Sequence, residues 1–492
     1  MKKRSTFLRM CFTDSRIVGV YNISVLLFFL IFESVCLISC SREDRSTRNS
    51  VTDSKQEIEN KQEDSSEVDV KPSNEDKEKS HDEEKPQTIH VFIENSGSMN
   101  GYINADSDFQ MAIGRVIQLM KGYYKNIRVY YINQTAKEQD PKGEDIYKFV
   151  KKMLEKREFT TSGTGKKDTD TDSTDLNQIL SRVLQDVDSD NTAILISDFI
   201  YSLSSTNGVT KSLLYDCQNL TMSAVWSKVK DLNGLLAANI IQLYSNFNGN
   251  YWSWEHPTGL KYAINLENCS RPYYIGVFGT DANVRYFNEK ISVSELAGYK
   301  NQYTLSSRDV SDSKWTVMPT YSKKGIQFRY DKSSVIQSIK NVKKLSRDSY
   351  NLSVCIDLSH FLIPEFEPAS FKVYDDNHEI ESVQKLDQIT LSHPADKDLA
   401  EKNQCTHVVV LKSEDNIPRN FSFGIERTIP KWIEASSSDD DKEIKDNKTE
   451  QSKTFGIKYF VNGISDAYRQ YANDNGKNKD NLITFTIEIE KR

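Results

Sequence analysis

The pattern of apolar and polar positions divides the chain into two parts with different periodicities. Between residues 88 and about 290, short apolar runs alternate with amphipathic segments, as buried parallel strands alternate with connecting helices. The expected strands are Thr88–Ile93, Ile127–Ile132, Thr192–Ile196, Ala238–Tyr244 and Tyr273–Phe278. A first helix is expected to begin with Ser107 or Asp108 as its cap. Further helices are expected over residues 144–155, 176–187 and 213–229. This alternation predicts an α/β fold, a parallel sheet with helices on both faces, over residues 88–295.

From about residue 300 the period changes to two, which is typical of strands that bury one face. The expected strands lie near Thr304 and at Gln327–Tyr330, Leu352–Leu358, Phe371–Tyr374, His407–Leu411, Phe421–Ile425, Phe455–Phe460 and Leu482–Ile489. One helix is expected near Ile464–Tyr471. The pattern predicts a β-rich, sandwich-like C-terminal domain over residues 300–492, with a split into two smaller β units as the alternative.

The first 39 residues have the features of an export signal. A basic start precedes the apolar run Val25–Phe32, and the segment leads to the sequence Leu-Ile-Ser-Cys ending at Cys40. These four residues resemble the lipobox of bacterial lipoproteins, in which the cysteine is acylated. Residues 1–39 are therefore expected to be a signal peptide and Cys40 the lipidation site. A transmembrane anchor is the alternative, but Glu33 ends the apolar run before it reaches a comfortable spanning length.

The residues after Cys40 bear on location. Ser41 stands where an Asp commonly retains lipoproteins in the inner membrane, so we expect an outer-membrane lipoprotein. Glu43 and Asp44 resemble a short acidic signal for surface export in some Gram-negative lineages, which makes cell-surface display a further hypothesis. Residues 41–87 contain 15 acidic and 9 basic residues and no aromatic residue. Such a segment cannot bury enough apolar area to offset its ordering entropy, so residues 40–87 are expected to form a disordered charged tether.

The net charge of the chain bears on whether it binds nucleic acid. The chain has 64 Lys and Arg residues against 71 Asp and Glu residues, a net charge of -7, and most of the excess lies in the tether. A nucleic-acid-binding protein needs a basic surface to displace counterions from phosphates. No nucleic acid partner is therefore expected.

Four cysteines remain beyond Cys40, and an exported protein can join them in three ways. In the strand Leu352–Leu358 the aliphatic residues alternate to one face, which places Cys355 on the other. We expect disulfides between Cys355 and Cys405 and between Cys217 and Cys269. No CxxC spacing is present, which argues against a zinc ribbon or a thioredoxin-like site.

Three loops of the predicted sheet offer oxygen ligands at one edge. Ser96 and Ser98 follow the first strand, Thr174 opens a helix, and Asp198 follows the strand Thr192–Ile196. Because the carboxyl ends of parallel strands share one edge, these side chains are expected to converge. Hydroxyl and carboxylate oxygens suit Mg²⁺, Mn²⁺ or Ca²⁺.

The same residues resemble the metal-ion-dependent adhesion site of von Willebrand factor type A domains, which has an Asp-x-Ser-x-Ser motif after the first strand. Ser96 and Ser98 match its serines, Thr174 its threonine and Asp198 its later aspartate, while Glu94 stands in place of its first Asp. The resemblance covers about 200 of the 492 residues. It implies a Rossmann-like type A domain whose cation is held by these five residues.

The resemblance also implies that the cation keeps one open position for an acidic side chain of a protein ligand. A cation with few carboxylates in its first shell retains positive charge and attracts a carboxylate, which indicates binding rather than catalysis. The expected function is that of a membrane-anchored, adhesion-type protein and not an enzyme. The alternative is a periplasm-facing assembly or scaffold factor without metal, in which Ser96 and Ser98 only cap a helix.

Other motifs carry less weight. The alternating carboxylates of residues 167–172 lack the glycine and distal glutamate of an EF-hand, so a solvated loop is favoured over a calcium site. The aromatic segment Tyr251–Trp254 is interpreted as packing on the sheet, with a binding platform as the alternative. His90 is expected to be a hydrogen-bonded core residue. No HExxH or Gly-x-Ser-x-Gly motif supports a hydrolase.

Overall fold

The computed structural model describes residues 88–103, 107–133, 135–155, 175–203, 210–253, 262–363, 365–374, 378–414 and 416–491. The predicted signal peptide, the predicted lipidation site Cys40 and the predicted tether lie outside these ranges, as does Thr174. No helix within them has both the length and the apolar character needed to cross a membrane.

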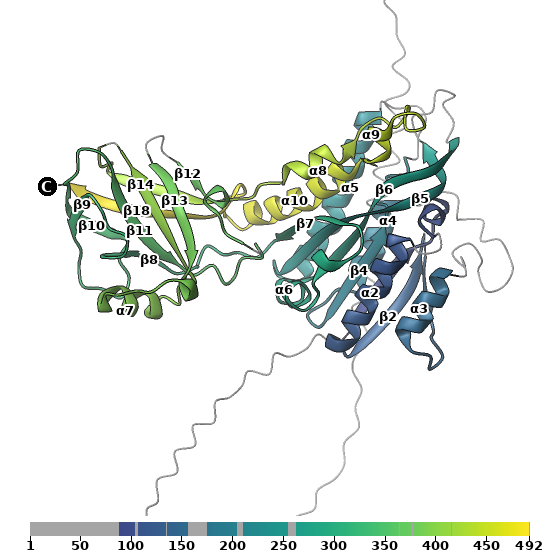
Figure 1. The fold of residues 1–492 in the computed structure, drawn as a ribbon, viewed down its shortest axis with the longest axis horizontal. Coiled ribbons are helices and arrows are strands. Elements are labelled where there is room, and N and C mark those ends of the chain that lie inside the picture. The colour runs from purple at the N-terminus through teal and green to yellow at the C-terminus, as the bar shows by residue number, and fades with distance from the viewer. Residues whose placement is uncertain are drawn as a thin grey trace, which may run out of the picture. The chain divides into compact units, whose positions relative to one another are not determined.

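The first part of the described chain is a seven-stranded sheet with helices on both faces (Figure 1). Its strand order is β3 (Ala136–Gln139), β2 (Asn126–Ile132), β1 (Thr88–Glu94), β4 (Asn191–Ser197), β6 (Tyr262–Thr280), β5 (Leu236–Ser253) and β7 (Tyr299–Ser306). Its helices are α2 (Asp108–Tyr123), α3 (Ile146–Glu155), α4 (Leu176–Gln185), α5 (Thr210–Asp231) and α6 (Asp281–Lys290). The mixed α/β class predicted from the alternation is therefore present.

The prediction of a parallel sheet is correct only for its centre. Strands β2, β1 and β4 run parallel, with Thr88 opposite both Asn126 and Asn191. Strands β3, β6, β5 and β7 pair antiparallel with their neighbours. Strands β5 and β6 are also much longer than predicted, and only residues 254–261 separate them. So short a connection cannot make the crossover that parallel pairing requires, and the two strands form a hairpin.

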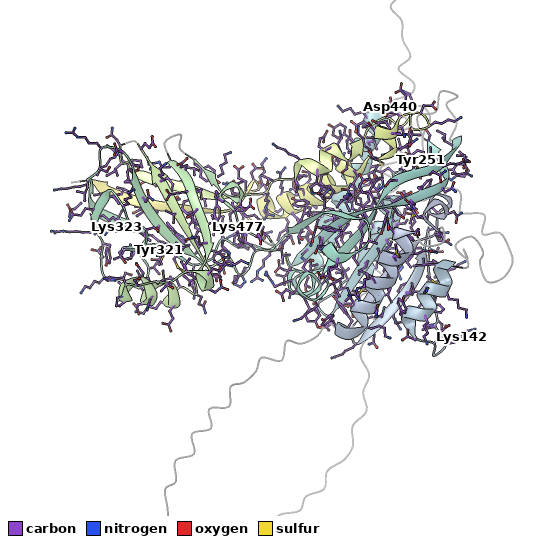
Figure 2. The ribbon with its side chains drawn as sticks, in the orientation of Figure 1. Lys142, Tyr251, Tyr321, Lys323, Asp440 and Lys477 are labelled. Carbon is purple, nitrogen blue, oxygen red and sulfur yellow. A yellow bond between two sulfur atoms is a disulfide. The ribbon has the colours of Figure 1, made fainter. Side chains whose placement is uncertain are left out.

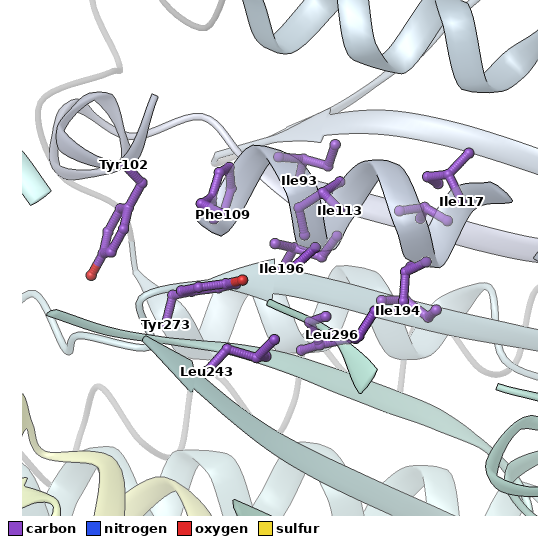
Figure 3. Close-up of a cluster of buried hydrophobic side chains, with 14 of the residues drawn as sticks. Ile93, Tyr102, Phe109, Ile113, Ile117, Ile194, Ile196, Leu243, Tyr273 and Leu296 are labelled. Atoms are coloured by element: carbon purple, nitrogen blue, oxygen red, sulfur yellow. The ribbon is translucent and has the colours of Figure 1, made fainter. Parts of the chain in front are cut away.

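One face of the sheet is covered by α2, α3 and α6. Helix α2 begins as predicted, because the Ser107 hydroxyl accepts a hydrogen bond from the Gln110 N–H at 3.2 Å. Its apolar stripe, which includes Phe109, Ile113 and Ile117, packs on Ile194 and Ile196 of β4 (Figure 3). This packing fixes the chain that leads out of β1.

The other face is covered by α4, α5 and a helix from near the end of the chain, α10 (Ile457–Asp474). Figure 1 shows α10 lying along α5. The predicted strand Phe455–Phe460 was wrong, since only Thr454–Phe455 (β17) is extended and Ile457 opens the helix. Buried residues recur there with helical spacing, as Ile457, Phe460, Val461 and Ile464 show, so the helical period starts before the predicted Ile464.

A segment preceding α10 lies against the β5–β6 hairpin, and we call residues 436–456 the C-terminal strap. It contains β16 (Ser437–Ser438), α9 (Lys448–Gln451) and β17, and α8 (Lys431–Ala435) comes before it. Asp440 of the strap and Tyr251 of β5 lie at the same end of the sheet (Figure 2). The strap falls in the range predicted for the β-rich domain, yet its contacts are with the α/β sheet.

The remaining residues form two further sheets around a shared core. One has the order β12 (Lys372–Val373), β15 (Asn420–Glu426), β18 (Asn481–Lys491), β10 (Ser338–Lys344) and β9 (Ile326–Arg329). The other has the order β13 (His378–Lys385), β14 (His407–Ser413), β11 (Tyr350–Ile356) and β8 (Trp315–Met318), with α7 (Pro394–Lys402) nearby. The pairs are antiparallel except that β10 runs parallel to β18. This arrangement agrees with the predicted sandwich-like architecture.

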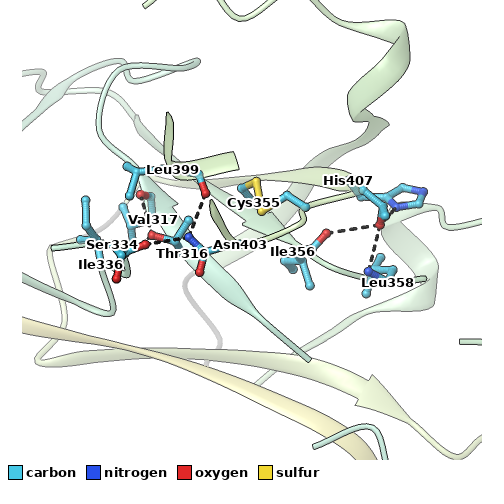
Figure 4. The surroundings of a disulfide bond; sticks show 12 residues. Thr316, Val317, Ser334, Ile336, Cys355, Ile356, Leu358, Leu399, Asn403 and His407 are labelled. Atoms are coloured by element: carbon cyan, nitrogen blue, oxygen red, sulfur yellow. Dashed lines mark hydrogen bonds between the residues drawn. A yellow bond between two sulfur atoms is a disulfide. The ribbon is translucent and has the colours of Figure 1, made fainter. Parts of the chain in front are cut away.

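The predicted disulfide between Cys355 and Cys405 is present (Figure 4). Cys355 lies on the opposite face of β11 from Leu352 and Val354, in a small apolar cluster with Leu391 and Ala400. The predicted pairing of Cys217 with Cys269 was wrong, and both are free. Cys217 packs on the face of the first sheet that carries α5, whereas Cys269 packs on the face that carries α2, so the sheet separates the two thiols.

Candidate functional site

Four of the five residues predicted to hold a metal lie at the carboxyl ends of β1 and β4, and hydrogen bonds join three of them, Ser96, Ser98 and Asp198. Strand β1 ends at Glu94, and Asp198 directly follows Ser197 at the end of the neighbouring parallel strand β4. Both carboxylates are buried, with 5% of Glu94 and 3% of Asp198 exposed. After β1, Ser96 precedes a short helix and Ser98 is the second residue of that helix. We call Glu94, Ser96, Ser98 and Asp198 the crest.

The two serines do not serve as helix caps here. Ser96 occupies the N-cap position of the short helix η1 (Gly97–Tyr102), but its side chain makes no capping hydrogen bond. Instead its Oγ lies 2.9 Å from the Oγ of Ser98. Ser98 in turn shares a side-chain hydrogen bond with Asp198. The two hydroxyls are thereby linked to the carboxylate that follows β4.

Asp198 is held in a nearly dry environment. Burial raises the pKa of its carboxyl, and the Ser98 hydroxyl, the Arg271 guanidinium and the Ile200 N–H all act in the opposite direction. The Ile200 N–H donates to Oδ1 of Asp198 at 3.3 Å. A desolvated carboxylate of this kind is stabilised by any further positive charge placed beside it.

Arg271 is the functional-site residue that sequence reasoning missed. It lies on β6 with 1% of its surface exposed, and its charge acts on Asp198. Its guanidinium donates to the carbonyl oxygens of Gln451 at 3.0 Å and Lys453 at 3.4 Å, both in the C-terminal strap. No sequence motif identifies Arg271 as a site residue, because a single arginine just before an apolar run is typical of the start of a strand.

The strap is fixed to the hairpin by further buried polar contacts. The Tyr251 hydroxyl donates to the Asp441 carboxylate at 3.1 Å, and the Ser253 hydroxyl donates to the same carboxylate at 3.1 Å. The Tyr274 hydroxyl donates to Oγ1 of Thr454 at 3.1 Å. These contacts hold β5 and β6 against residues 180 to 190 positions later in the chain.

Trp252 packs against Gly97, the residue between the two serines of the crest. Its neighbours Tyr251 and Ser253 are buried, whereas 40% of Trp252 is exposed. A Cβ atom placed on Gly97 would lie 3.3 Å from Nε1 of Trp252, so the indole covers the glycine between the two serines. The interpretation of the aromatic segment as packing therefore holds for Tyr251, while Trp252 faces outward and Trp254 lies outside the described residues.

The remaining residues singled out in the sequence are Thr174, the acidic loop 167–172 and His90. Thr174 and the acidic loop 167–172 lie outside the described ranges, but the adjacent Asp175 caps α4 by accepting a hydrogen bond from the Asn177 N–H at 2.9 Å. His90 is 8% exposed, and its Nδ1 lies 3.1 Å from the Tyr130 hydroxyl. The prediction of a hydrogen-bonded core histidine is confirmed.

The donor set of the crest fits a hard divalent cation. It offers two carboxylates and two hydroxyls, all oxygen ligands, at one edge of the sheet. Within the part of the chain that the structure describes, no three His, Cys, Asp or Glu side chains gather in a group able to hold a metal ion. A cation at the crest would therefore depend on the serine hydroxyls as well as on the carboxylates.

Comparison with known proteins adds no relative. No protein family model, no curated protein and no solved structure matches this chain.

Proposed function

We propose that this chain is a binding protein that engages an acidic side chain of a protein partner through a divalent cation, Mg²⁺ by preference, at the crest. The observation that carries the proposal is the hydrogen-bonded series of Ser96, Ser98 and Asp198 beside the buried Glu94. Thr174 would complete the set, as in the type A domains that the motif resembles. The parallel centre of the sheet and its two helical layers support that resemblance.

Bound at the crest, the cation supplies positive charge and an open position for a carboxylate oxygen. The protein's own residues orient the oxygen ligands and keep the carboxylates desolvated, which strengthens their interaction with the cation. The set offers oxygen ligands to a cation and, through the cation, a place for a partner's carboxylate, so the proposed function is binding.

The proposal extends to location. We infer that Cys40 carries lipid, that residues 40–87 tether the folded part, and that the protein belongs to the outer membrane with its binding site exposed to a partner. Protease treatment of intact cells tests the orientation, with a periplasmic protein as the protected control. Cleavage of the chain at the surface is expected, and full protection would instead favour a periplasm-facing role.

A second function, a scaffold factor that works without metal, is favoured by one observation. The buried Arg271 already supplies positive charge to Asp198. In that case the crest would be a structural polar cluster and the protein surface around it would bind a partner directly.

Calorimetry with Mg²⁺ and Mn²⁺ on the purified full chain separates the two functions. The variant Ser96→Ala plus Ser98→Ala should lose cation binding, because both hydroxyl ligands are removed. Ser223→Ala plus Ser227→Ala is the matched control, since both of these serines are exposed on α5. Binding that is absent in the wild type, or unchanged in the crest variant, would overturn the metal-dependent function.

A further inference from the structure

The side chain of Trp252 has an unusual setting for a large aromatic residue. The hydroxyls of its neighbours Tyr251 and Ser253 both donate to Asp441, which fixes the backbone on each side of it. The indole is nevertheless 40% exposed and lies beside the polar crest instead of in a core. Its position is thus rigidly supported, while part of its surface stays available to a ligand.

The edge of the ring that faces the crest is the polar one. Of the Trp252 atoms, Nε1 comes nearest to a Cβ placed on Gly97, at 3.3 Å, and Cε2 follows at 3.9 Å. Gly97 lies between Ser96 and Ser98, so the indole nitrogen packs against the backbone of the segment that carries the two hydroxyls. An indole N–H can only donate a hydrogen bond, so it favours an acceptor at this place.

A carboxylate that binds a cation through one oxygen has a second oxygen that needs a donor. Building on the proposed function, we propose that Trp252 is a specificity-determining residue of the crest, whose indole N–H receives an aspartate or glutamate carboxylate of the partner protein. The ring beside it offers an apolar surface to the methylene groups of that side chain. A glycine at position 97 fits this role, because the Cβ of any other residue would lie 3.3 Å from the indole nitrogen, which is tighter than an ordinary contact.

The test uses the purified full chain with Mn²⁺ and acetate as probes. Acetate affinity is measured from the paramagnetic relaxation of its methyl protons, and Mn²⁺ affinity is measured separately by calorimetry. Trp252→Phe keeps an aromatic ring and removes the N–H. We expect unchanged Mn²⁺ affinity and acetate affinity about tenfold weaker, as for the loss of a hydrogen bond to a charged group.

Trp226→Phe is the matched control, because its indole N–H donates to Asp474 at 3.1 Å, away from the crest. This control should bind acetate as the wild type does. Equal acetate affinity in Trp252→Phe and the wild type, with Mn²⁺ bound to both, would overturn the role of Trp252 and leave the proposed function standing. A wild type that binds no Mn²⁺ would overturn both.

Discussion

The guanidinium carbon of Arg271 lies 4.6 Å from the centre of the Tyr251 ring. Both residues also donate hydrogen bonds to the C-terminal strap. Arg271 donates to backbone carbonyl oxygens of the strap, and Tyr251 donates to the Asp441 carboxylate. A buried arginine stacked on an aromatic ring and bonded to two carbonyls is difficult to replace, because both its charge and its planar shape are used. The pair therefore joins the hairpin, the strap and the crest.

Replacing Arg271 should release the strap. Arg271→Met leaves two buried carbonyls without their donor, and we expect the free energy of unfolding to fall by about 3 kcal/mol. Urea denaturation measures this change, and limited proteolysis should show new cleavage within residues 436–456. Arg128→Met, at an exposed position, is the control and should change stability by less than about 0.5 kcal/mol. A strap equally protected in Arg271→Met would contradict this role.

The aromatic cluster below the crest offers a matched pair of hydroxyl deletions. Tyr273 is fully buried, and its hydroxyl has no hydrogen-bond partner in the described structure, whereas the Tyr102 hydroxyl donates to the Pro272 carbonyl at 2.6 Å. Tyr273→Phe should therefore keep or raise stability, by up to about 1 kcal/mol, and Tyr102→Phe should lower it by about 1 kcal/mol. Thermal unfolding of both variants is the measurement. The reverse order would mean that Tyr273 has a bound water as partner.

The disulfide between Cys355 and Cys405 should be a major source of stability. The two cysteines are 50 positions apart, and removing a link that closes a loop of this size costs about 4 kcal/mol on the chain-entropy scale. We expect Cys355→Ala plus Cys405→Ala to show this loss in urea denaturation. Cys269→Ala, which breaks no disulfide, is the control.

The two free thiols should react slowly in the folded protein. Burial raises the pKa of the Cys217 thiol to about 12 and also raises that of Cys269, so little thiolate forms near neutral pH. Alkylation of the folded protein should modify both residues slowly. Peptide mapping after alkylation in denaturant should find both residues modified and Cys355 linked to Cys405. A peptide that joins Cys217 to Cys269 would contradict the structure.

His90 should make stability depend on pH. Burial lowers its pKa below the usual 6.5, although Asp186 acts in the opposite direction. The unfolded chain then binds more protons than the folded one below about pH 6.5, so stability should fall as the pH drops from 7 toward 5. His90→Gln should flatten this slope in urea denaturation at several pH values. His407, whose pKa burial also lowers, contributes with the same sign, so some slope should remain.

The sequence predicted the parts of the fold that depend on local pattern. Local pattern was enough to predict β1, β2, β4 and α2. Each of these strands contains a continuous apolar run, and α2 has a continuous apolar stripe, because these are the residues that become buried. The outer halves of β5 and β6 were not predicted, because beyond Tyr244 and Pro272 they pair only with each other and carry mixed polarity. Their pairing depends on partners that no local period encodes.

The candidate site likewise contains some residues that sequence patterns predict and others that depend on distant parts of the chain. The meeting of Ser98 with Asp198 follows from the rule that the ends of parallel strands share an edge. Arg271 and the strap could not be predicted, because their contact joins residues about 180 positions apart and uses backbone carbonyls, which every residue has. Trp252 belongs to the aromatic segment Tyr251–Trp254, which stands out in the sequence. Which aromatic residue of that segment lies beside the crest depends on the strand register, which the sequence pattern does not give.

The attachment of the hairpin to the strap also sets an order of folding. Chains emerge from the ribosome with the N-terminus first, and a two-stranded ribbon is marginally stable alone. The β5–β6 hairpin that carries Trp252 and Arg271 is complete at residue 280, yet its partners at residues 441–453 are made much later. Strand β18, which pairs with β10 and β15, comes later still. A chain without its last sixty residues would thus lack both α10 and β18. The first sheet would then miss the part of its core that α10 supplies, and the two C-terminal sheets would miss the part that β18 supplies.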